Sequence, residues 1–122
     1  MIKILKKLGA KVYRVLDDLI IDGSQIKDVC IDYNLCKTMR SSIFLLGSIL
    51  ARFKSICITM PGGCNIGKRP IDIHIDAFKR LGVKVIEMND FIFFNASKAK
   101  AGKIHLKIPS VGATENIVQF AS

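Results

Sequence analysis

The chain has 122 residues, half of them hydrophobic, and carries a formal net charge of +9 at pH 7. This length suffices for one modest hydrophobic core but not for two ordinary domains, and the hydrophobic content excludes an intrinsically disordered chain. The positive charge favours an anionic partner, which could be nucleic acid, acidic lipid or a phosphorylated small molecule.

The first elements predicted along the chain are a helix and a hairpin. Residues 2–8 carry apolar side chains at helical spacing, and Gly9 supplies the stop expected just past a helix. Short β-rich runs at 11–16 and 19–21 are separated by two aspartates, which predicts a hairpin. Alternation over residues 29–33 then predicts a third strand.

A long helix is predicted over residues 36–53, which are apolar on nearly every side and should be buried all round. Arg40 lies in its first turn, where the positive end of the helix macrodipole gives a cation no stabilisation. A bound anion would remove that conflict, because helix amino termini beside an arginine are natural phosphate sites. The residues alone favour the plainer alternative, in which the guanidinium reaches solvent or pairs with a carboxylate.

The second half of the chain shows the same kinds of element. A β-rich run at 55–60 leads into a loop, and a helix then runs up to Gly82, with Pro70 suited to its first position. Two more β-rich runs, at 83–86 and 91–94, predict a second hairpin.

Three features are predicted after the second hairpin. Residues 97–102 form a basic stretch whose simplest interpretation is a solvated turn. Alternation over 104–108 predicts a strand. A further helix is expected from Gly112, with Ser110 as its cap.

An internal repeat connects the two halves of the chain. Leu8-Gly9-Ala10-Lys11-Val12 recurs 73 residues later as Leu81-Gly82-Val83-Lys84-Val85. A hairpin, an alternating strand and a helix are predicted after each copy. Such self-similarity implies stacked modules that share a core, so we predict an α/β (α+β) fold of repeated strand-helix units, with a repeat boundary near residues 54–60.

Cysteine usage and hydropathy bear on metal binding and location. The four cysteines form no C-x-x-C pair, so with His74 and His105 they match no zinc pattern, and we expect no metal or other cofactor. His74 is expected at the surface or in a hydrogen bond. No secretion signal is recognisable, and the longest uncharged apolar stretch, 41–51, is far shorter than a bilayer span. We therefore expect a soluble, cytoplasmic chain with free thiols and no membrane partner.

The most informative stretch is the loop from Pro61 to Pro70, which has Cys64 near its centre. Glycines on both sides of the cysteine allow close approach to a ligand, and the adjacent Lys68 and Arg69 could lower the thiol pKa or pair with an anion. Cation and thiol together suggest chemistry on an anion. The alternative is a surface turn with an unreactive cysteine, and the loop alone does not decide between the two.

Residues 60–74 (MPGGCNIGKRPIDIH) closely resemble the catalytic loop of the UDP-N-acetylglucosamine enolpyruvyl transferases, and residues 37–53 and 109–116 agree in order and spacing. The resemblance implies transfer of the enolpyruvyl group of phosphoenolpyruvate to the 3′-hydroxyl of UDP-N-acetylglucosamine, with release of phosphate, as the first committed step of peptidoglycan synthesis. It also implies an inside-out α/β barrel, of which about one and a half repeat units are present.

The same resemblance implies roles for ten residues. Cys64 would be the catalytic proton donor and would form a covalent adduct with phosphoenolpyruvate. The implied substrate-binding residues are Arg40, Arg69, Pro70, Ile71, Asp72, Ile73, Ser110, Val111 and Gly112. Some relatives carry a lysine where this chain has Ile108, which puts one nucleotide contact in doubt.

The resemblance covers only about a third of the length of such a two-domain enzyme. A Lys-Asn pair that binds phosphoenolpyruvate would lie upstream of Met1, and a catalytic aspartate would lie in a second domain. We therefore expect residues 1–122 to form a single partial domain that is inactive without the missing domain or a complementary chain.

Parts of the sequence are compatible with two other functions. A small basic nucleic-acid-binding module is favoured by the net charge and by Lys98, Lys100, Lys103 and Lys107, but the chain has no tryptophan and no RNP or KH signature. A sister enzyme acting on shikimate phosphate or RNA ends would share the repeated fold. The loop around Cys64 argues against such an enzyme, because the loop resembles the amino-sugar branch.

Overall fold

The computed structural model describes residues 1–27, 29–31, 33–59, 71–89 and 91–122, and within α2 and η1 it leaves aside the side chains of residues 37, 38 and 40. The helices are α1 (Ile2–Lys7), α2 (Tyr33–Thr38), the 3₁₀ helix η1 (Arg40–Phe44), α3 (Leu45–Phe53), α4 (Asp72–Arg80) and α5 (Val111–Ala121). The strands are β1 (Lys11–Val15), β2 (Asp18–Asp22), β3 (Ser55–Thr59), β4 (Lys84–Met88) and β5 (Phe91–Asn95).

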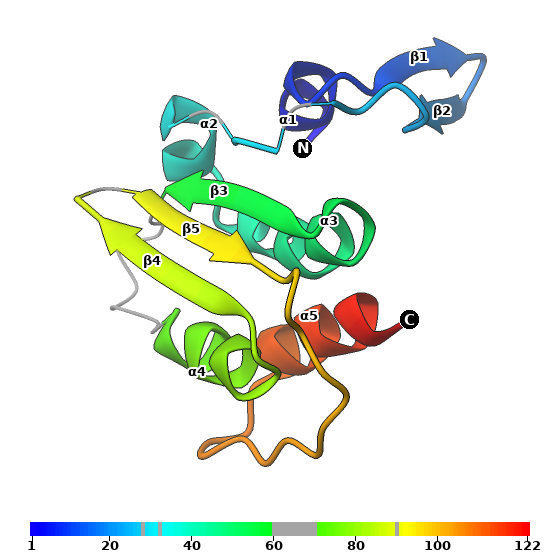
Figure 1. Ribbon diagram of the computed structural model, residues 1–122. Helices are drawn as coiled ribbons and strands as arrows, with labels where there is room; N and C mark the ends of the chain where they lie inside the picture. Colours follow the sequence, from blue (N-terminus) through cyan, green and yellow to red (C-terminus); the bar gives the residue numbers. More distant parts are fainter. Residues whose placement is uncertain (28, 32, 60–70, 90) are drawn as a thin grey trace.

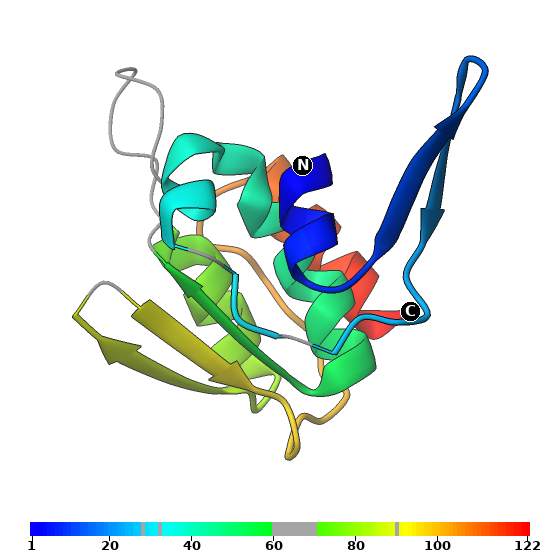
Figure 2. The same ribbon diagram turned by 90° about the horizontal axis from the view of Figure 1, so that it is seen from above.

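The body of the molecule has two layers, a sheet and a set of helices (Figure 1). The sheet has the antiparallel order β3-β5-β4, in register from Ser55 opposite Asn95 on one side and from Lys84 opposite Asn95 on the other. Helices α3 and α4 lie against one face of this sheet, and α5 packs against α3 and α4 (Figures 1 and 2). The core therefore lies between the sheet and these three helices.

Aromatic rings fill the centre of this core. Phe78 of α4 is fully buried and meets two other rings edge to face, Phe94 of β5 at 6.0 Å and Phe120 of α5 at 5.5 Å between centroids. Ile56 of β3 and Leu50 of α3 are buried beside them. One ring thus joins the sheet to two helices, in the geometry that aromatic pairs prefer.

Strands β1 and β2 form a separate two-stranded hairpin that projects from the body (Figure 2). Apolar side chains are exposed along much of its length, namely Tyr13, Val15, Leu16, Leu19, Ile20 and Ile21. Only Val12 of the hairpin strands is buried. The described body therefore leaves most of the hairpin's apolar surface uncovered.

The helix stops and hairpins of the predicted internal repeat are confirmed in backbone geometry. Helices α1 and α4 both lead into a Leu-Gly pair, with φ +102° at Gly9 and +79° at Gly82, and a hairpin follows each. The two hairpins pair in the same register, and each turn opens on a residue of positive φ, Leu16 at 53° and Asn89 at 48°. Because only glycine adopts such φ values without strain, the Leu-Gly pairs are explained by the sharp stop that each helix requires.

Hydrogen bonds after the hairpins repeat at the same spacing of 73 residues. Asp22 accepts the Ser24 N–H at 2.8 Å, and its counterpart Asn95 accepts the Ser97 N–H at 3.0 Å. Two backbone hydrogen bonds of the first unit also have counterparts in the second. The bond from Lys27 N–H to Leu8 C=O at 3.2 Å corresponds to that from Lys100 N–H to Leu81 C=O at 2.8 Å. The bond from Ile26 N–H to Gly23 C=O at 3.2 Å corresponds to that from Ala99 N–H to Ala96 C=O at 3.0 Å. The repeat unit is therefore a helix stop, a hairpin and a return turn.

The two predicted alternating strands do not form as predicted. Among residues 29–31, Cys30 makes an isolated parallel bridge to Cys57 of β3, flanked by hydrogen bonds from Cys57 N–H to Val29 C=O at 2.8 Å and from Ile31 N–H to Cys57 C=O at 2.9 Å, and Tyr33 already begins α2. No strand forms over 104–108. There the Arg80 guanidinium donates to the His105 carbonyl at 2.9 Å, so a side chain supplies a bond that a neighbouring strand would otherwise supply. Alternating residues specify two faces but cannot supply a partner strand.

The single helix predicted over 36–53 is also wrong. Met39 has an extended backbone, with φ −139° and ψ 107°, which separates α2 from η1, and α3 follows η1 at Leu45. Helix α3 is not buried all round, because Ser48 and Arg52 are exposed. The other predicted helices and both hairpins are confirmed, including α5 with Ser110 as its cap.

Candidate substrate site

The predicted site residues fall into two groups. Cys64, Arg69 and Pro70 lie outside the described residues. Arg40 begins η1, and its side chain is not described. Six residues are described at the starts of two helices: Ile71, Asp72 and Ile73 at α4, and Ser110, Val111 and Gly112 at α5.

The starts of α4 and α5 lie together in the fold. A Cβ built on Gly112 would lie 3.6 Å from Cε1 of His74 in the first turn of α4, and 3.2 Å from Cε1 of Phe44 at the end of η1. These distances leave little room for a side chain at position 112. The fold thus brings together two sequence segments that were each predicted to bind substrate.

Each residue at the start of α4 has a different exposure. Ile71 is the N-cap residue and is only 6% exposed, so its side chain belongs to the core. Asp72 is exposed in the first turn, where a carboxylate is stabilised by the helix macrodipole. Ile73 is half-buried. Only Asp72 and Ile73 therefore offer side-chain surface to a ligand here.

The start of α5 is held by its own side chains. Ser110 accepts the Ala113 N–H through Oγ at 3.3 Å, and Thr114 Oγ1 donates to the Ser110 carbonyl at 2.8 Å. Val111 is highly exposed. Since no acidic residue lies in the first turn, the positive end of this helix is not neutralised from within.

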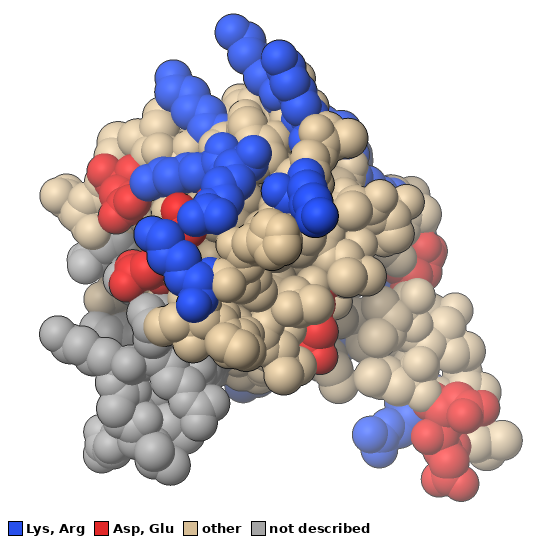
Figure 3. Space-filling model, turned by 90° about the horizontal axis from the view of Figure 1, so that it is seen from below, with Lys and Arg blue, Asp and Glu red and all other residues tan. Residues whose placement is uncertain are grey.

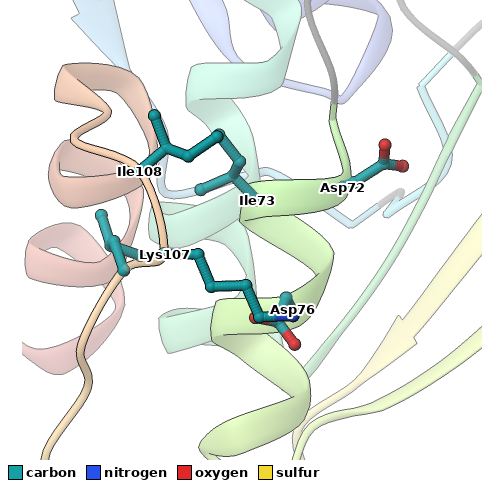
Figure 4. A pocket seen from close by; sticks show the side chains of 6 residues that line it. Asp72, Ile73, Asp76, Lys107 and Ile108 are labelled. Carbon is teal, nitrogen blue, oxygen red and sulfur yellow. The ribbon is translucent and has the colours of Figure 1, made fainter.

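A pocket of about 310 Å³ lies beside these helix starts (Figure 4). Its lining residues are Asp72, Ile73, Asp76, Leu106, Lys107 and Ile108. Ile73 and Ile108 extend toward one another, and Lys107 extends toward Asp76 (Figure 4). Asp76 also pairs with Arg80 at 3.1 Å. An apolar wall with two carboxylates and one ammonium group at its edge can hold an uncharged ring and both accept and donate hydrogen bonds to it.

A buried polar network behind the site was not predicted. Asn116 of α5 is fully buried, accepts the Gly47 N–H through Oδ1 at 2.9 Å and donates from Nδ2 to the Ile43 carbonyl at 3.1 Å. The same Nδ2 lies 3.0 Å from Nδ1 of His74. The prediction of a hydrogen bond for His74 is confirmed, whereas its surface alternative is wrong, because His74 is 8% exposed. The sequence feature that could have predicted this network is the amide of Asn116, which lies among apolar residues of α5.

Basic side chains gather on the face seen from below in Figure 3. The bottom of Figure 1 is formed by α4 and the segment over 97–109. Exposed cations on these two segments are Lys79, Arg80, Lys98, Lys100, Lys103 and Lys107. Arg80 is engaged by Asp76 and the His105 carbonyl, and Lys79 lies 3.7 Å from Glu87. Part of this charge is therefore compensated within the chain.

The described residues hold neither a candidate metal cluster nor a candidate membrane-spanning helix. Outside the gaps given above, no group of three or more His, Cys, Asp or Glu side chains is placed to hold a metal ion. Among the helices that the structure describes, none combines the length and apolar character needed to cross a membrane.

Comparisons with known proteins give the family. The model of the family EPSP synthase (3-phosphoshikimate 1-carboxyvinyltransferase) matches residues 1–122. UDP-N-acetylglucosamine 1-carboxyvinyltransferase 2 of Caldanaerobacter subterraneus subsp. tengcongensis is 47% identical over 122 residues, which are 100% of this chain and 29% of that protein. UDP-N-acetylglucosamine 1-carboxyvinyltransferase 1 of Carboxydothermus hydrogenoformans is 42% identical, with the same coverage.

The solved structures include a similar fold. The enolpyruvyl transferase NikO from Streptomyces tendae matches with a TM-score of 0.75 at 16% identity, over 97% of this chain and 28% of that chain. This likeness supports the predicted repeated α/β fold. The chain spans about 29% of the length of the curated relatives it matches. With the family model matching from the first residue to the last, the chain belongs to the EPSP synthase family.

Proposed function

We propose that this chain is part of an enzyme that transfers the enolpyruvyl group of phosphoenolpyruvate to the 3′-hydroxyl of UDP-N-acetylglucosamine. The observation that carries the proposal is the 47% identity, over the whole chain, to a UDP-N-acetylglucosamine 1-carboxyvinyltransferase. The proposed enzyme serves peptidoglycan synthesis in the cytoplasm. Because the chain spans 29% of that relative, the complete reaction needs residues from elsewhere.

Cys64 is the proposed acid of this reaction. Its thiol would give a proton to the methylene carbon of phosphoenolpyruvate, while the sugar hydroxyl adds to the neighbouring carbon. Loss of phosphate and of a proton then restores the double bond. A thiol suits this work because it can hold and release a proton near neutral pH, and after giving up its proton it can also form a covalent adduct with phosphoenolpyruvate at the carbon next to the methylene group.

The proposed substrate contacts fall into two kinds, cationic contacts to phosphate oxygens and contacts to the UDP-sugar. Arg40 and Arg69 are proposed to hold phosphate oxygens, since a guanidinium binds them in bidentate fashion. Pro70 precedes the segment 71–73, which is proposed to line the UDP-sugar beside the pocket that contains Asp72 and Ile73. Ile71 would act through its backbone, because its side chain is buried.

The nucleotide is proposed to lie against the turn formed by Ser110, Val111 and Gly112. Three features of the turn support this role: the capped start of α5, the absence of an acidic residue in its first turn, and the nearness of Gly112 to His74 of α4. Ile108 lines the pocket where some relatives have a lysine, so its contact there would be apolar.

We further propose that residues 1–122 form part of one domain, with a repeat boundary near 54–60, and that a second domain or a complementary chain completes the site. The repeat of 73 residues supports the boundary, because α3 ends the first unit at Phe53 and β3 begins the next at Ser55. The 29% coverage of the relatives supports the need for additional residues. The isolated chain is therefore expected to show no turnover.

Labelling with fosfomycin tests the proposed function. This epoxide resembles phosphoenolpyruvate and should alkylate Cys64 selectively, and UDP-N-acetylglucosamine should accelerate the reaction. Intact mass and peptide mapping give the modified residue, and Cys64→Ser is the matched control. Equal labelling of Cys30, Cys36 and Cys57, or no labelling with either ligand, would contradict a working half-site in this chain.

No comparison favours the nucleic-acid-binding alternative, and part of the basic surface is paired within the chain. Its test is binding of single-stranded RNA at low salt. A steep loss of affinity with added salt would support that alternative, because released counterions dominate such binding. We expect no binding that competes with UDP-N-acetylglucosamine.

A further inference from the structure

We propose that Asn116 is a positioning residue for the substrate site, and that it acts by holding three helix starts at once. This inference rests on the proposed function, because it concerns the same site. Asn116 itself is fully buried, so it cannot touch a ligand. Its effect must pass through the groups that it binds.

Each polar group of the Asn116 amide has a partner. Oδ1 accepts a hydrogen bond from the Gly47 N–H at 2.9 Å. Nδ2 donates one hydrogen to the Ile43 carbonyl at 3.1 Å and the other to His74 Nδ1 at 3.0 Å. Helix α3 has no capping side chain at Phe44, so Asn116 supplies the acceptor for a first-turn N–H from outside the helix. Buried bonds of this kind are costly to lose, because each abandoned partner stays desolvated.

Two partners of Asn116, Ile43 and His74, lie close in the chain to predicted site residues. Ile43 is in η1, which begins at Arg40, and His74 directly follows Ile73 in the first turn of α4. Asn116 lies one turn after Gly112 on α5. One buried amide therefore links the three segments from which Arg40, Asp72–Ile73 and Ser110–Gly112 are presented.

The arrangement also assigns the tautomer of His74. Because Nδ2 of Asn116 can only donate, Nδ1 of His74 must accept, and the proton of a neutral ring lies on Nε2. Aspartate at position 116 could still accept from Gly47, but it could not donate to Ile43 or to His74. Alanine could do neither. This chemistry explains why an amide is required there.

The experiment compares Asn116→Ala and Asn116→Asp with Gln119→Ala, an exposed amide on the same helix. Three quantities are measured on the whole chain by NMR: the protonation pattern of the His74 ring nitrogens, the NOE between the His74 ring and Gly112, and the Kd for UDP-N-acetylglucosamine. We expect an unprotonated Nδ1 in the parent chain and a protonated Nδ1 in Asn116→Asp. We also expect a lost NOE in both Asn116 variants and a Kd raised about tenfold or more, since small misplacements at a site are costly.

The outcomes separate this inference from the proposed function. A parent chain that does not bind UDP-N-acetylglucosamine contradicts a working nucleotide-sugar half-site in this chain, and the ring spectra and NOE then decide the positioning role alone. A protonated Nδ1 in the parent chain overturns the inference without any variant, which covers the case in which both variants fail to fold. A folded Asn116 variant with parental NOE and Kd also overturns it. A parental result for Gln119→Ala, with changes only at Asn116, supports it.

Discussion

Gly47 of α3 and Asn116 of α5 touch backbone to backbone, and a Cβ on residue 47 would overlap the Asn116 carbonyl group. In an open helix, exchanging glycine for alanine stabilises by about 1 kcal/mol. The overlap should reverse that sign. We expect Gly47→Ala to lower the free energy of unfolding by about 1–3 kcal/mol, because neither helix backbone can move without disturbing the core.

Urea denaturation followed by circular dichroism measures this change. Gly102→Ala is the control, since a Cβ there would have its nearest described neighbour, Leu81 Cδ2, at 3.8 Å. Its effect should stay within about 0.5 kcal/mol. Equal stabilities for the two variants would mean that α3 and α5 do not approach so closely.

Phe78 should be the most costly aromatic side chain to truncate. It is fully buried and its ring meets both Phe94 and Phe120. We expect Phe78→Ala to lower the free energy of unfolding by about 3–5 kcal/mol, through lost burial and the cavity left behind. Phe91→Ala, at a ring that is 41% exposed, should cost less than half as much in the same denaturation experiment. A smaller loss for Phe78→Ala than for Phe91→Ala would contradict the packing described.

The repeat predicts opposite responses at equivalent positions of the two hairpins. Ile21 of β2 is 50% exposed, whereas its counterpart Phe94, 73 residues later, is fully buried. Ile21→Lys should therefore change stability by less than about 0.5 kcal/mol, and Phe94→Lys should prevent folding, because a buried unpaired charge is very costly.

Sedimentation and thermal unfolding check this pair. Ile21→Lys should also reduce any self-association, since a charge on an exposed edge strand opposes strand pairing between molecules. If Ile21→Lys unfolds the chain, the apolar face of the hairpin is covered in solution, contrary to the structure.

Asp22 provides a pH-dependent prediction. The side-chain and backbone hydrogen bonds from Ser24 hold the pKa of Asp22 below its usual value of 3.8. The folded pKa is therefore lower than the unfolded pKa, so this contribution to stability is present above pH 3.8 and is lost as the pH falls through the folded pKa.

Carbonyl NMR titration measures the pKa of Asp22. Ser24→Ala removes the first of the two hydrogen bonds and should raise that pKa toward its usual value. Ser97→Ala, the equivalent change in the second repeat, should leave the titration of Asp22 unaltered. A titration that Ser24→Ala does not shift would assign the depression to the nearby cations Lys11 and Arg52, which also lower the pKa.

Local patterns predicted much of the fold because the information is local. The stops at Gly9 and Gly82 and the cap at Ser110 each depend on a few consecutive residues. The break at Met39 does not, since the apolar run around it continues in the sequence and only the extended backbone at that residue separates α2 from η1. Likewise, the carbonyl bond from Arg80 to His105 joins residues far apart in the chain.

The candidate site was predicted in its parts but not in its assembly. The resemblance pointed to Asp72, Ile73 and the turn at Ser110–Gly112, and the fold brings these together. The amide of Asn116 that links them was missed. A polar residue on an apolar helix face signals a buried hydrogen bond, but its partners Gly47 and His74 become known only when three helices are packed.

The uncovered hairpin has a consequence for synthesis in the cell. Its strands are fully formed, yet side chains such as Leu19 and Ile21 are exposed, although their counterparts in the second hairpin are buried. Surfaces of this kind are what chaperones bind and what draws partly folded chains into aggregates. Until another polypeptide surface covers it, the β1–β2 hairpin should be the part of this chain that depends most on chaperones.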